Sequence, residues 1–112
     1  MGSKPYPLKR SSIFKEVATK GTRKRLSAWL TLQMLPSVDA KNYFGVTVSR
    51  KVANSVIRNK LKRWVRNCVS TEKWPEKYES YTFVFVFKPQ ADAKFFTQKK
   101  YSDFKDLYKN IK

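Results

Sequence analysis

Residues 50 to 66 most restrict what this chain can be, because they combine seven cations and no acid with a helical spacing of apolar residues. The nearest carboxylates on either side are those of Asp39 and Glu72. The whole chain of 112 residues carries a formal charge of +17. A basic surface this uninterrupted attracts a polyanion. The helical spacing predicts that one face packs and the opposite face stays free for a partner.

We expect a helix capped by Asn54 or Ser55 and running to about Val69. At 100° per residue, five apolar side chains fall within about a third of the helical wheel and predict a packed stripe: Ile57, Leu61, Trp64, Val65 and Cys68. Three cations follow one another at i, i+4 spacing on another face, with Asn59 and Arg63 beside them: Arg58, Lys62 and Arg66.

Two interpretations of this basic face compete. A charged helix face often serves only solubility, and like charges one turn apart destabilise an isolated helix by a few tenths of a kcal/mol each. The absence of acid and the abundance of arginine favour a polyanion site instead. Arginine grips phosphate oxygens in fork geometry, whereas Lys60 and Lys62 act as mobile point charges. Asn54 and Asn59 either contact sugar and phosphate or satisfy the backbone, and for Trp64 a core role is favoured.

The remaining patterns predict a single domain over residues 1–112, in which helices cover one side of a sheet. An extended basic arm over residues 1–10 precedes the first helix. Apolar periods of 3.6 predict helices and periods of two predict strands. The expected elements are a helix at 13–20 capped by Ser12 and stopped by Gly21, a loop at 22–25, strands at 26–35, 43–49 and 81–87, a loop with Phe95 and Phe96, and a last helix capped near Ser102.

The aromatic residues of the strand at 81–87 have two possible roles. Phe83, Phe85 and Phe87 point one way, and Val84 and Val86 point the other. The phenylalanines either form the core of one sheet face or line a groove in which unpaired bases stack, at about 1–3 kcal/mol per base. Phe14, on a helix flanked by basic segments, is ambiguous in the same way.

Several classes of chemistry are disfavoured by composition. The chain has no histidine and one cysteine, so His-based acid–base catalysis, disulfides and Cys-cluster zinc sites are excluded. The glycines are not clustered into a phosphate-binding loop, and the carboxylates form no motif for acid–base or two-metal work. No stretch approaches the roughly 20 apolar residues of a membrane span, and the N-terminus lacks a signal-peptide core. We therefore expect a cytoplasmic binding protein with no catalytic residues and no metal site.

The basic helix and the segment before it closely resemble the protein component of bacterial ribonuclease P. The resemblance rests on Val48-Ser49-Arg50-Lys51-Val52, on Asn54, and on Val56 to Arg63 with Arg66. Arg58-Asn59-Lys60 fills that family's R-N-R signature, with lysine in the third place. Gly21, Gly45 and the strand at 81–87 agree with other family landmarks, so the resemblance covers about residues 8 to 111.

The resemblance implies a fold and a division of labour. The implied fold is an α+β sandwich of order α-β-β-β-α-β-α, with helices against a mixed sheet whose βαβ crossover is left-handed, contrary to the usual rule. The implied catalyst is an RNA subunit that uses Mg²⁺ to remove the 5′ leader of precursor tRNA. The protein is implied to bind that RNA and to hold the single-stranded leader in a cleft between the first helix and the sheet.

Residue roles follow from the same resemblance. Catalytic-RNA contacts are implied for nine residues, namely Arg50, Lys51, Asn54, Arg58, Asn59, Lys60, Lys62, Arg63 and Arg66. Leader contacts are expected for Phe14, Phe85 and Phe87. The family often has a second aromatic residue one turn after Phe14, and this chain has Ala18 there, so leader affinity or stacking is expected to differ.

Three other functions remain as alternatives. The first is a generic RNA-binding or ribosome-associated protein with no role in cleavage. The second is a binder of membrane surfaces, which we disfavour because the apolar face of the basic helix has a sheet to pack against rather than lipid. The third is a DNA-reading helix, although no helix-turn-helix pairing precedes it.

Overall fold

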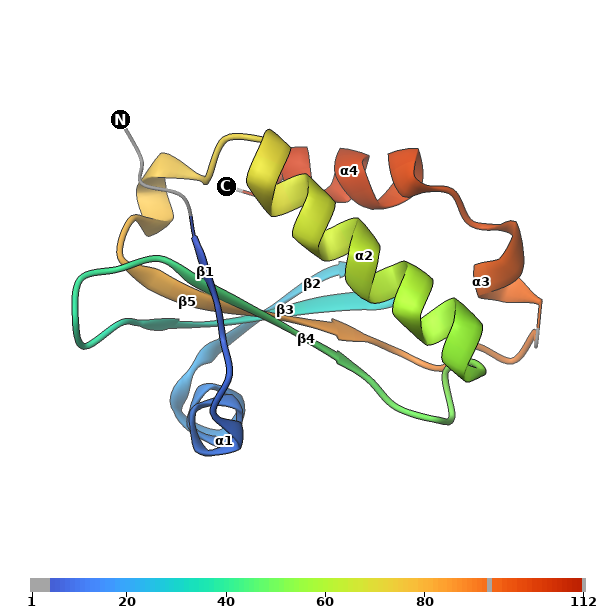
Figure 1. The fold of residues 1–112 in the computed structure, drawn as a ribbon, viewed down its shortest axis with the longest axis horizontal. Helices are drawn as coiled ribbons and strands as arrows, with labels where there is room; N and C mark the ends of the chain where they lie inside the picture. Colours follow the sequence, from blue (N-terminus) through green and yellow to red (C-terminus); the bar gives the residue numbers. More distant parts are fainter. Residues whose placement is uncertain (1–4, 93, 112) are drawn as a thin grey trace.

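A computed structural model describes residues 5–92 and 94–111 of the chain and shows a five-stranded mixed sheet of order β1-β4-β5-β3-β2 (Figure 1). The part of the basic arm at residues 1–4 lies outside the described residues. The strands are β1 Tyr6–Pro7, β2 Thr22–Ser27, β3 Leu30–Pro36, β4 Tyr43–Val48 and β5 Tyr81–Phe87. The helices are α1 Ser11–Lys20, α2 Ser55–Thr71, α3 Phe95–Gln98 and α4 Tyr101–Lys109, with a 3-10 turn at Glu76–Tyr78.

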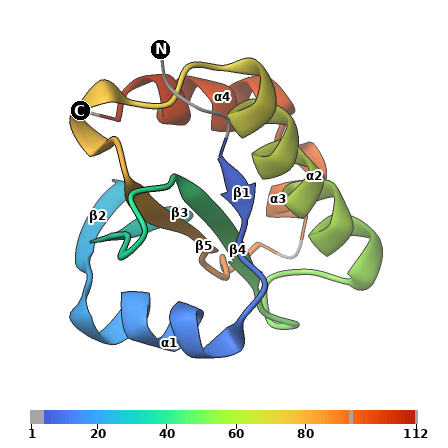
Figure 2. The same ribbon diagram turned by 60° about the vertical axis from the view of Figure 1, so that its left-hand side comes forward.

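The sheet is covered on both faces, and not on one side as the sequence pattern predicted. The two longer C-terminal helices, α2 and α4, lie over one face, and α1 crosses the other face (Figure 2). The α+β class and the mixed sheet are confirmed. Part of the predicted arm forms the short strand β1, which pairs in parallel with β4. The Leu8 N–H also donates to the Phe44 carbonyl at 2.8 Å, so residues 6–8 of the arm are held against the sheet.

The connection from β4 through α2 to β5 makes the left-handed crossover that the resemblance implied. The two strands are parallel neighbours, with Phe44 opposite Phe83 and Val46 opposite Phe85. Figures 1 and 2 show α2 returning above the sheet so that β5 is reached with the hand opposite to the common one.

The prediction of one strand over 26–35 after a loop at 22–25 was wrong. These residues form a hairpin in which β2 pairs antiparallel with β3, with an irregular register between Arg25 and Ser27. The apolar alternation of Leu26, Ala28 and Leu30 runs through the turn because the turn residue Ala28, although exposed, is apolar. The other turn residue, Trp29, is buried with its ring centre 6.0 Å from that of Phe87. The first half of β2 was missed because an edge strand can be almost entirely polar and basic.

The predicted caps Ser12 and Ser102 both lie one residue inside their helices. Arg10 and Lys100 occupy the cap positions instead. In α4 the first turn is satisfied by the Asp103 carboxylate, which accepts the backbone N–H of Lys100 at 2.9 Å. Residues 95–98, which were expected to be loop, form the short α3.

An aromatic column on β5 forms the centre of the core. Phe83, Phe85 and Phe87 are at most 2% exposed. Trp74 stacks on Phe83 at a ring distance of 4.4 Å, and Phe104 of α4 lies 5.6 Å from Phe85. Such pairs stabilise by about 0.5–1.5 kcal/mol beyond the burial of their area. Of the two roles considered for these phenylalanines, the structure shows the core.

Gly21 ends α1 at a place where two backbones meet. Its φ of −77° lies outside the left-handed region, so conformational freedom is not the reason for glycine. A Cβ there would lie within 2.6 Å of the Met34 carbonyl oxygen and even closer to that of Val17. Both neighbours are backbone atoms, which cannot move aside cheaply.

We predict that Gly21→Ala lowers the free energy of unfolding by about 2–3 kcal/mol, because α1 must shift away from β3. Urea denaturation followed by circular dichroism measures this. Thr22→Ala, at the next and exposed position, is the control and should change stability by less than about 0.5 kcal/mol. Equal stability of the Gly21 variant and the wild type would contradict the close contact.

Candidate nucleic-acid interface

The basic helix α2 is fixed at its start by Asn54. The Asn54 side-chain oxygen accepts the backbone N–H of Ile57 at 3.0 Å, and its carbonyl accepts the N–H of Arg58 at 2.9 Å. Asn54 therefore caps α2, an interaction worth roughly 1 kcal/mol. Its exposed amide NH₂ still faces solvent beside the helix.

The apolar stripe of α2 is buried as predicted. Leu61, Val65 and Cys68 are fully buried and Trp64 is 6% exposed, whereas Ile57 is half-buried. The favoured core role of Trp64 is confirmed. The Lys60 ammonium lies 5.4 Å from the centre of the Trp64 ring, so a cation–π contact holds this lysine at the border between the stripe and the basic face.

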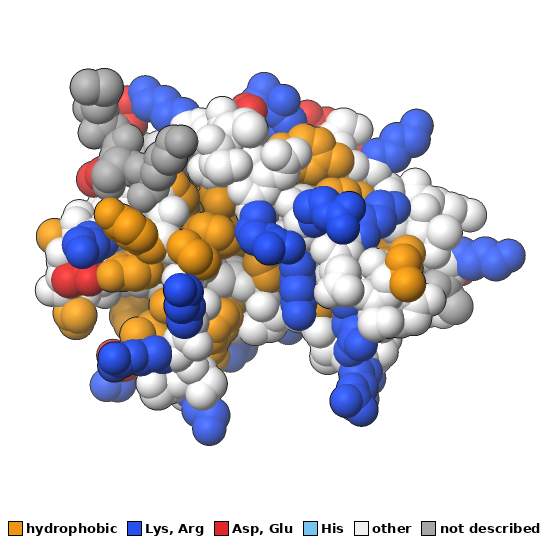
Figure 3. Space-filling view, viewed as in Figure 1, with side chains coloured by type: hydrophobic (Ala, Val, Ile, Leu, Met, Phe, Trp, Pro, Cys, Tyr) orange, Lys and Arg blue, Asp and Glu red, His pale blue; other side chains and the backbone are white. Residues whose placement is uncertain are grey.

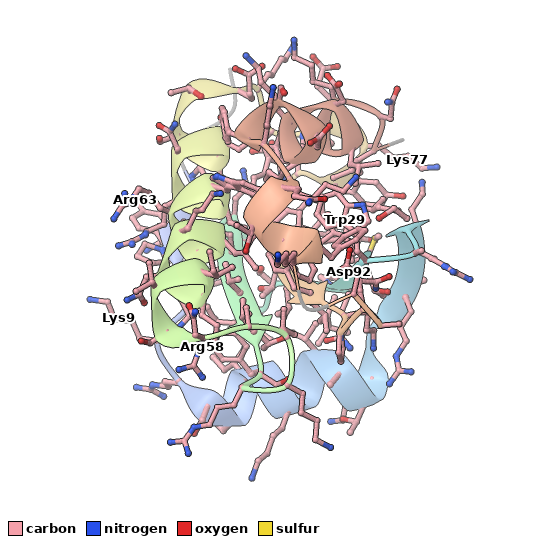
Figure 4. All side chains as sticks on the ribbon, turned by 90° about the vertical axis from the view of Figure 1, so that its right-hand side faces the viewer. Lys9, Trp29, Arg58, Arg63, Lys77 and Asp92 are labelled. Carbon is pink, nitrogen blue, oxygen red and sulfur yellow. The ribbon has the colours of Figure 1, made fainter. Side chains whose placement is uncertain are left out.

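The opposite side of α2 presents the cations to solvent. We call this surface the basic face. Figure 3 shows Lys and Arg side chains gathered over α2 and the segment before it, and in Figure 4 Arg58 and Arg63 point away from the body of the protein. All members are exposed except Arg58 and Lys60, which are half-buried: Arg50, Lys51, Asn54, Arg58, Asn59, Lys60, Lys62, Arg63 and Arg66.

No carboxylate within the described residues pairs with the basic face. Glu72, just beyond the C-terminal end of α2, lies 3.6 Å from the Lys105 ammonium and 3.8 Å from that of Lys109, both on α4. The first turn of α2 contains no acid, so its cations add to the positive end of the helix dipole. The resulting potential over this face is positive, which is the kind of surface that attracts anions.

Phe14 lies on the opposite face of the sheet, against β4. A Cβ on Gly45 would lie 2.5 Å from the Phe14 ring, so the absence of a side chain at Gly45 lets this ring approach the strand. Gly45 is therefore a site of close approach between α1 and β4. Phe85 and Phe87 are buried in the core on the α2 side, so they do not join Phe14. Their assignment to the leader cleft is therefore corrected.

Strand register identifies the residues that border α1 on the sheet. Gly45, Val84 and Gln33 lie side by side at the level where α1 crosses.

The next residues on this face are Thr47, Val86, Thr31 and Arg25, which we call the open row. Thr47 and Arg25 are exposed, and Val86 and Thr31 are half-buried. Sequence reasoning missed this row. The alternation that points Val84 and Val86 away from the phenylalanines was its only signal.

The strand β4 links the two surfaces. The helix α2 packs on one side of β4 and Phe14 on the other. Since β1 pairs with β4 only at Tyr43 and Phe44, the outer edge of β4 is free of β1 from Gly45 onward. This edge therefore joins the basic face to the open row.

A hollow lies on the other side of α1 from the open row, with a volume of about 450 Å³. Ile13, Val17 and Leu35 form its apolar wall. At its rim the Tyr43 hydroxyl donates to the Asp39 carboxylate, and this hydrogen bond lowers the pKa of Asp39.

The described part of the chain contains neither a metal-ligating cluster nor a membrane-spanning helix. There, no three histidine, cysteine or acidic side chains gather as they would to hold a metal ion. No helix within 5–92 and 94–111 is both long and apolar enough to cross a lipid bilayer.

Fold and surface together define a class: a basic α+β protein in which the exposed face of α2 is lined with cations. The family model described as Ribonuclease P matches residues 3–112. Because this match covers nearly the whole chain, the protein belongs to the ribonuclease P protein family.

Curated relatives agree with this assignment. The chain is 30% identical over 98 residues to the ribonuclease P protein component of Bacillus cereus, covering 87% of this chain and 84% of the relative. It is 33% identical over 87 residues to that of Gluconacetobacter diazotrophicus, covering 77% and 74%.

Solved structures support the fold. The RNase P protein of Staphylococcus aureus superposes with a TM-score of 0.77 at 17% identity, covering 96% of this chain and 93% of that one. The RNase P protein from Thermotoga maritima gives a TM-score of 0.76 at 20% identity, covering 95% and 97%.

We predict that the Cys68 thiol is inert in the folded protein. Burial raises its pKa to about 11, so at pH 8 only about a thousandth of it is thiolate, the reactive form. An aromatic disulfide reagent should react at least about a hundredfold faster after unfolding in urea than in native buffer. Comparable rates in the two states would contradict the burial of this face of α2.

Proposed function

We propose that this protein is the protein subunit of ribonuclease P and assists removal of the 5′ leader from precursor tRNA. In this proposal the basic face of α2 binds the catalytic RNA subunit. The single-stranded leader lies along Phe14 and the first three residues of the open row, Thr47, Val86 and Thr31, a surface that we call the leader groove. The observation that carries the proposal is the basic face itself. It has no carboxylate partner among the described residues, is fixed by a buried stripe and belongs to a fold of this family.

The chemistry is assigned to the RNA. The sequence has no histidine, and the described residues offer no metal cluster, so we place the Mg²⁺ ions and the hydrolytic step on the RNA subunit. The protein supplies cations that offset phosphate repulsion between catalytic RNA and substrate. Its cytoplasmic location remains a prediction from the sequence.

The leader groove is assigned from surface chemistry. Phe14 provides a flat ring, Val86 an apolar floor, and Thr31 and Thr47 hydroxyl groups. A base stacked on one aromatic ring gains about 1–3 kcal/mol with little dependence on its identity. A groove of this composition suits unpaired nucleotides of varied sequence.

We predict that the protein permits cleavage of precursor tRNA by a cognate catalytic RNA at magnesium concentrations where the RNA alone is slow. The physical reason is the neutralisation of RNA–substrate repulsion by the basic face. Reconstitution with labelled precursor tRNA and gel analysis of the 5′ product measures this, and the protein alone should cleave nothing.

Salt dependence provides an internal control for this reconstitution. If the basic face neutralises about six phosphates, a fourfold rise in salt should weaken RNA binding by about two to three orders of magnitude. Tight RNA binding without any change in cleavage would favour the alternative of a generic RNA-binding protein.

A second prediction separates the two surfaces. Arg63→Ala should weaken binding of the catalytic RNA by about three- to tenfold whatever the leader length, because it removes a phosphate contact. Phe14→Leu should weaken only the binding of substrates that carry a leader, because it removes the flat ring but keeps an apolar contact over Gly45. Filter binding with leaderless and leader-bearing substrates distinguishes the effects.

Lys77→Ala is the matched control, since Lys77 is an exposed cation on the 3-10 turn, away from both surfaces (Figure 4). It should change neither binding constant appreciably. An equal loss for Phe14→Leu on leaderless substrate would refute the groove assignment and leave the basic face untouched.

A further inference from the structure

The edge strand β2 carries two arginines that the proposed function leaves unused. Arg23 pairs with Gln33 and Arg25 with Thr31 across the β2–β3 ladder. Residues directly opposite in a ladder share a face, so both side chains stand on the α1 side of the sheet. Arg25 is thus the last member of the open row, and Arg23 lies beyond the end of α1.

Neither guanidinium is neutralised by a carboxylate within the described residues. The Arg23 Nη2 donates weakly to the Ala18 carbonyl at 3.5 Å, and the Arg25 Nε donates to the Ser27 carbonyl at 3.4 Å. Each guanidinium has five N–H donors, so most of them remain available for phosphate oxygens. Both residues are exposed.

The open row spans the sheet from one edge to the other. Thr47 stands on β4 at the edge below the basic face, and Arg25 stands on β2 at the far edge. Three strand spacings separate them, which makes roughly 14 Å. In Figure 4, which looks in from one end of the molecule, α1 lies across the bottom from the α2 side towards β2.

We propose that Arg25, assisted by Arg23, binds phosphates of leader nucleotides that extend beyond the groove. This inference rests on the proposed function, because the leader must enter from the side where α2 holds the catalytic RNA. The cleavage site lies at that RNA, so the upstream end of the leader points across the open row to β2. A short leader ends above Val86 and Thr31, and only a longer one reaches the arginines.

Basic residues on an edge strand also prevent pairing with other chains. That role predicts a different consequence of their removal, namely self-association that is independent of RNA. The leader-length experiment below separates the two roles, because self-association does not depend on the leader.

The test measures binding of precursor tRNA to the reconstituted complex while the leader is lengthened one nucleotide at a time. The wild type should gain affinity in two stages, first as the groove fills and then as β2 is reached. Arg23→Ala with Arg25→Ala should abolish the second stage, a loss of about three- to tenfold, and should reduce the salt slope by about 0.7 per arginine for long leaders only. Arg25→Lys should restore part of it, and Lys77→Ala should keep both stages.

A photocrosslinker at the 5′ end of a long leader tests the same contact in the unaltered protein. Crosslinks should map to Thr22–Ser27. Crosslinks confined to α1 or α2, or arginine variants that keep the second stage, would overturn the inference while a surviving first stage leaves the proposed function intact. If the affinity of the wild type for precursor tRNA did not change with leader length at all, both the proposed leader groove and this inference would be refuted.

Discussion

Burial of the apolar stripe of α2 in the same core as the aromatic column of β5 determines where the functional surfaces lie. Leu61, Trp64 and Val65 share one cluster with Phe83 and its neighbours. Each buried side chain of this size contributes about 1.5–3 kcal/mol, whereas each repulsion between neighbouring cations costs a few tenths. The stripe therefore outweighs the charge repulsion, and the helix is held with all its cations on the solvent side.

The two faces of the sheet differ in how far they are covered. Its α2 face is packed with aromatic side chains and supplies stability, so residues there are unavailable to any ligand. Its α1 face is only partly covered, because α1 crosses at the level of Val84 and leaves Val86, Thr31 and Thr47 at the surface. The free edge of β4 connects this face to the basic face.

The amphipathic α2 and the strand β5 were predicted from sequence because each has a strong, unbroken period. The hairpin was not, because Ala28 continued the alternation of Leu26 and Leu30 through the turn, and the basic first half of β2 has no alternation of its own. Phe85 and Phe87 were misplaced for a related reason. Alternation shows that two sets of side chains face opposite ways, but it does not say which face is covered.

What the sequence alone determined is the basic face: the positions of Arg58, Arg63 and Arg66 relative to Leu61 and Val65 follow from helical geometry within one segment. Only the tertiary structure decided the groove. It depends on which side of the sheet α1 crosses, on Gly45 admitting Phe14, and on the register that aligns Arg25 with Thr31, Val86 and Thr47. These are contacts between segments far apart in the chain, and local periodicity contains no information about them.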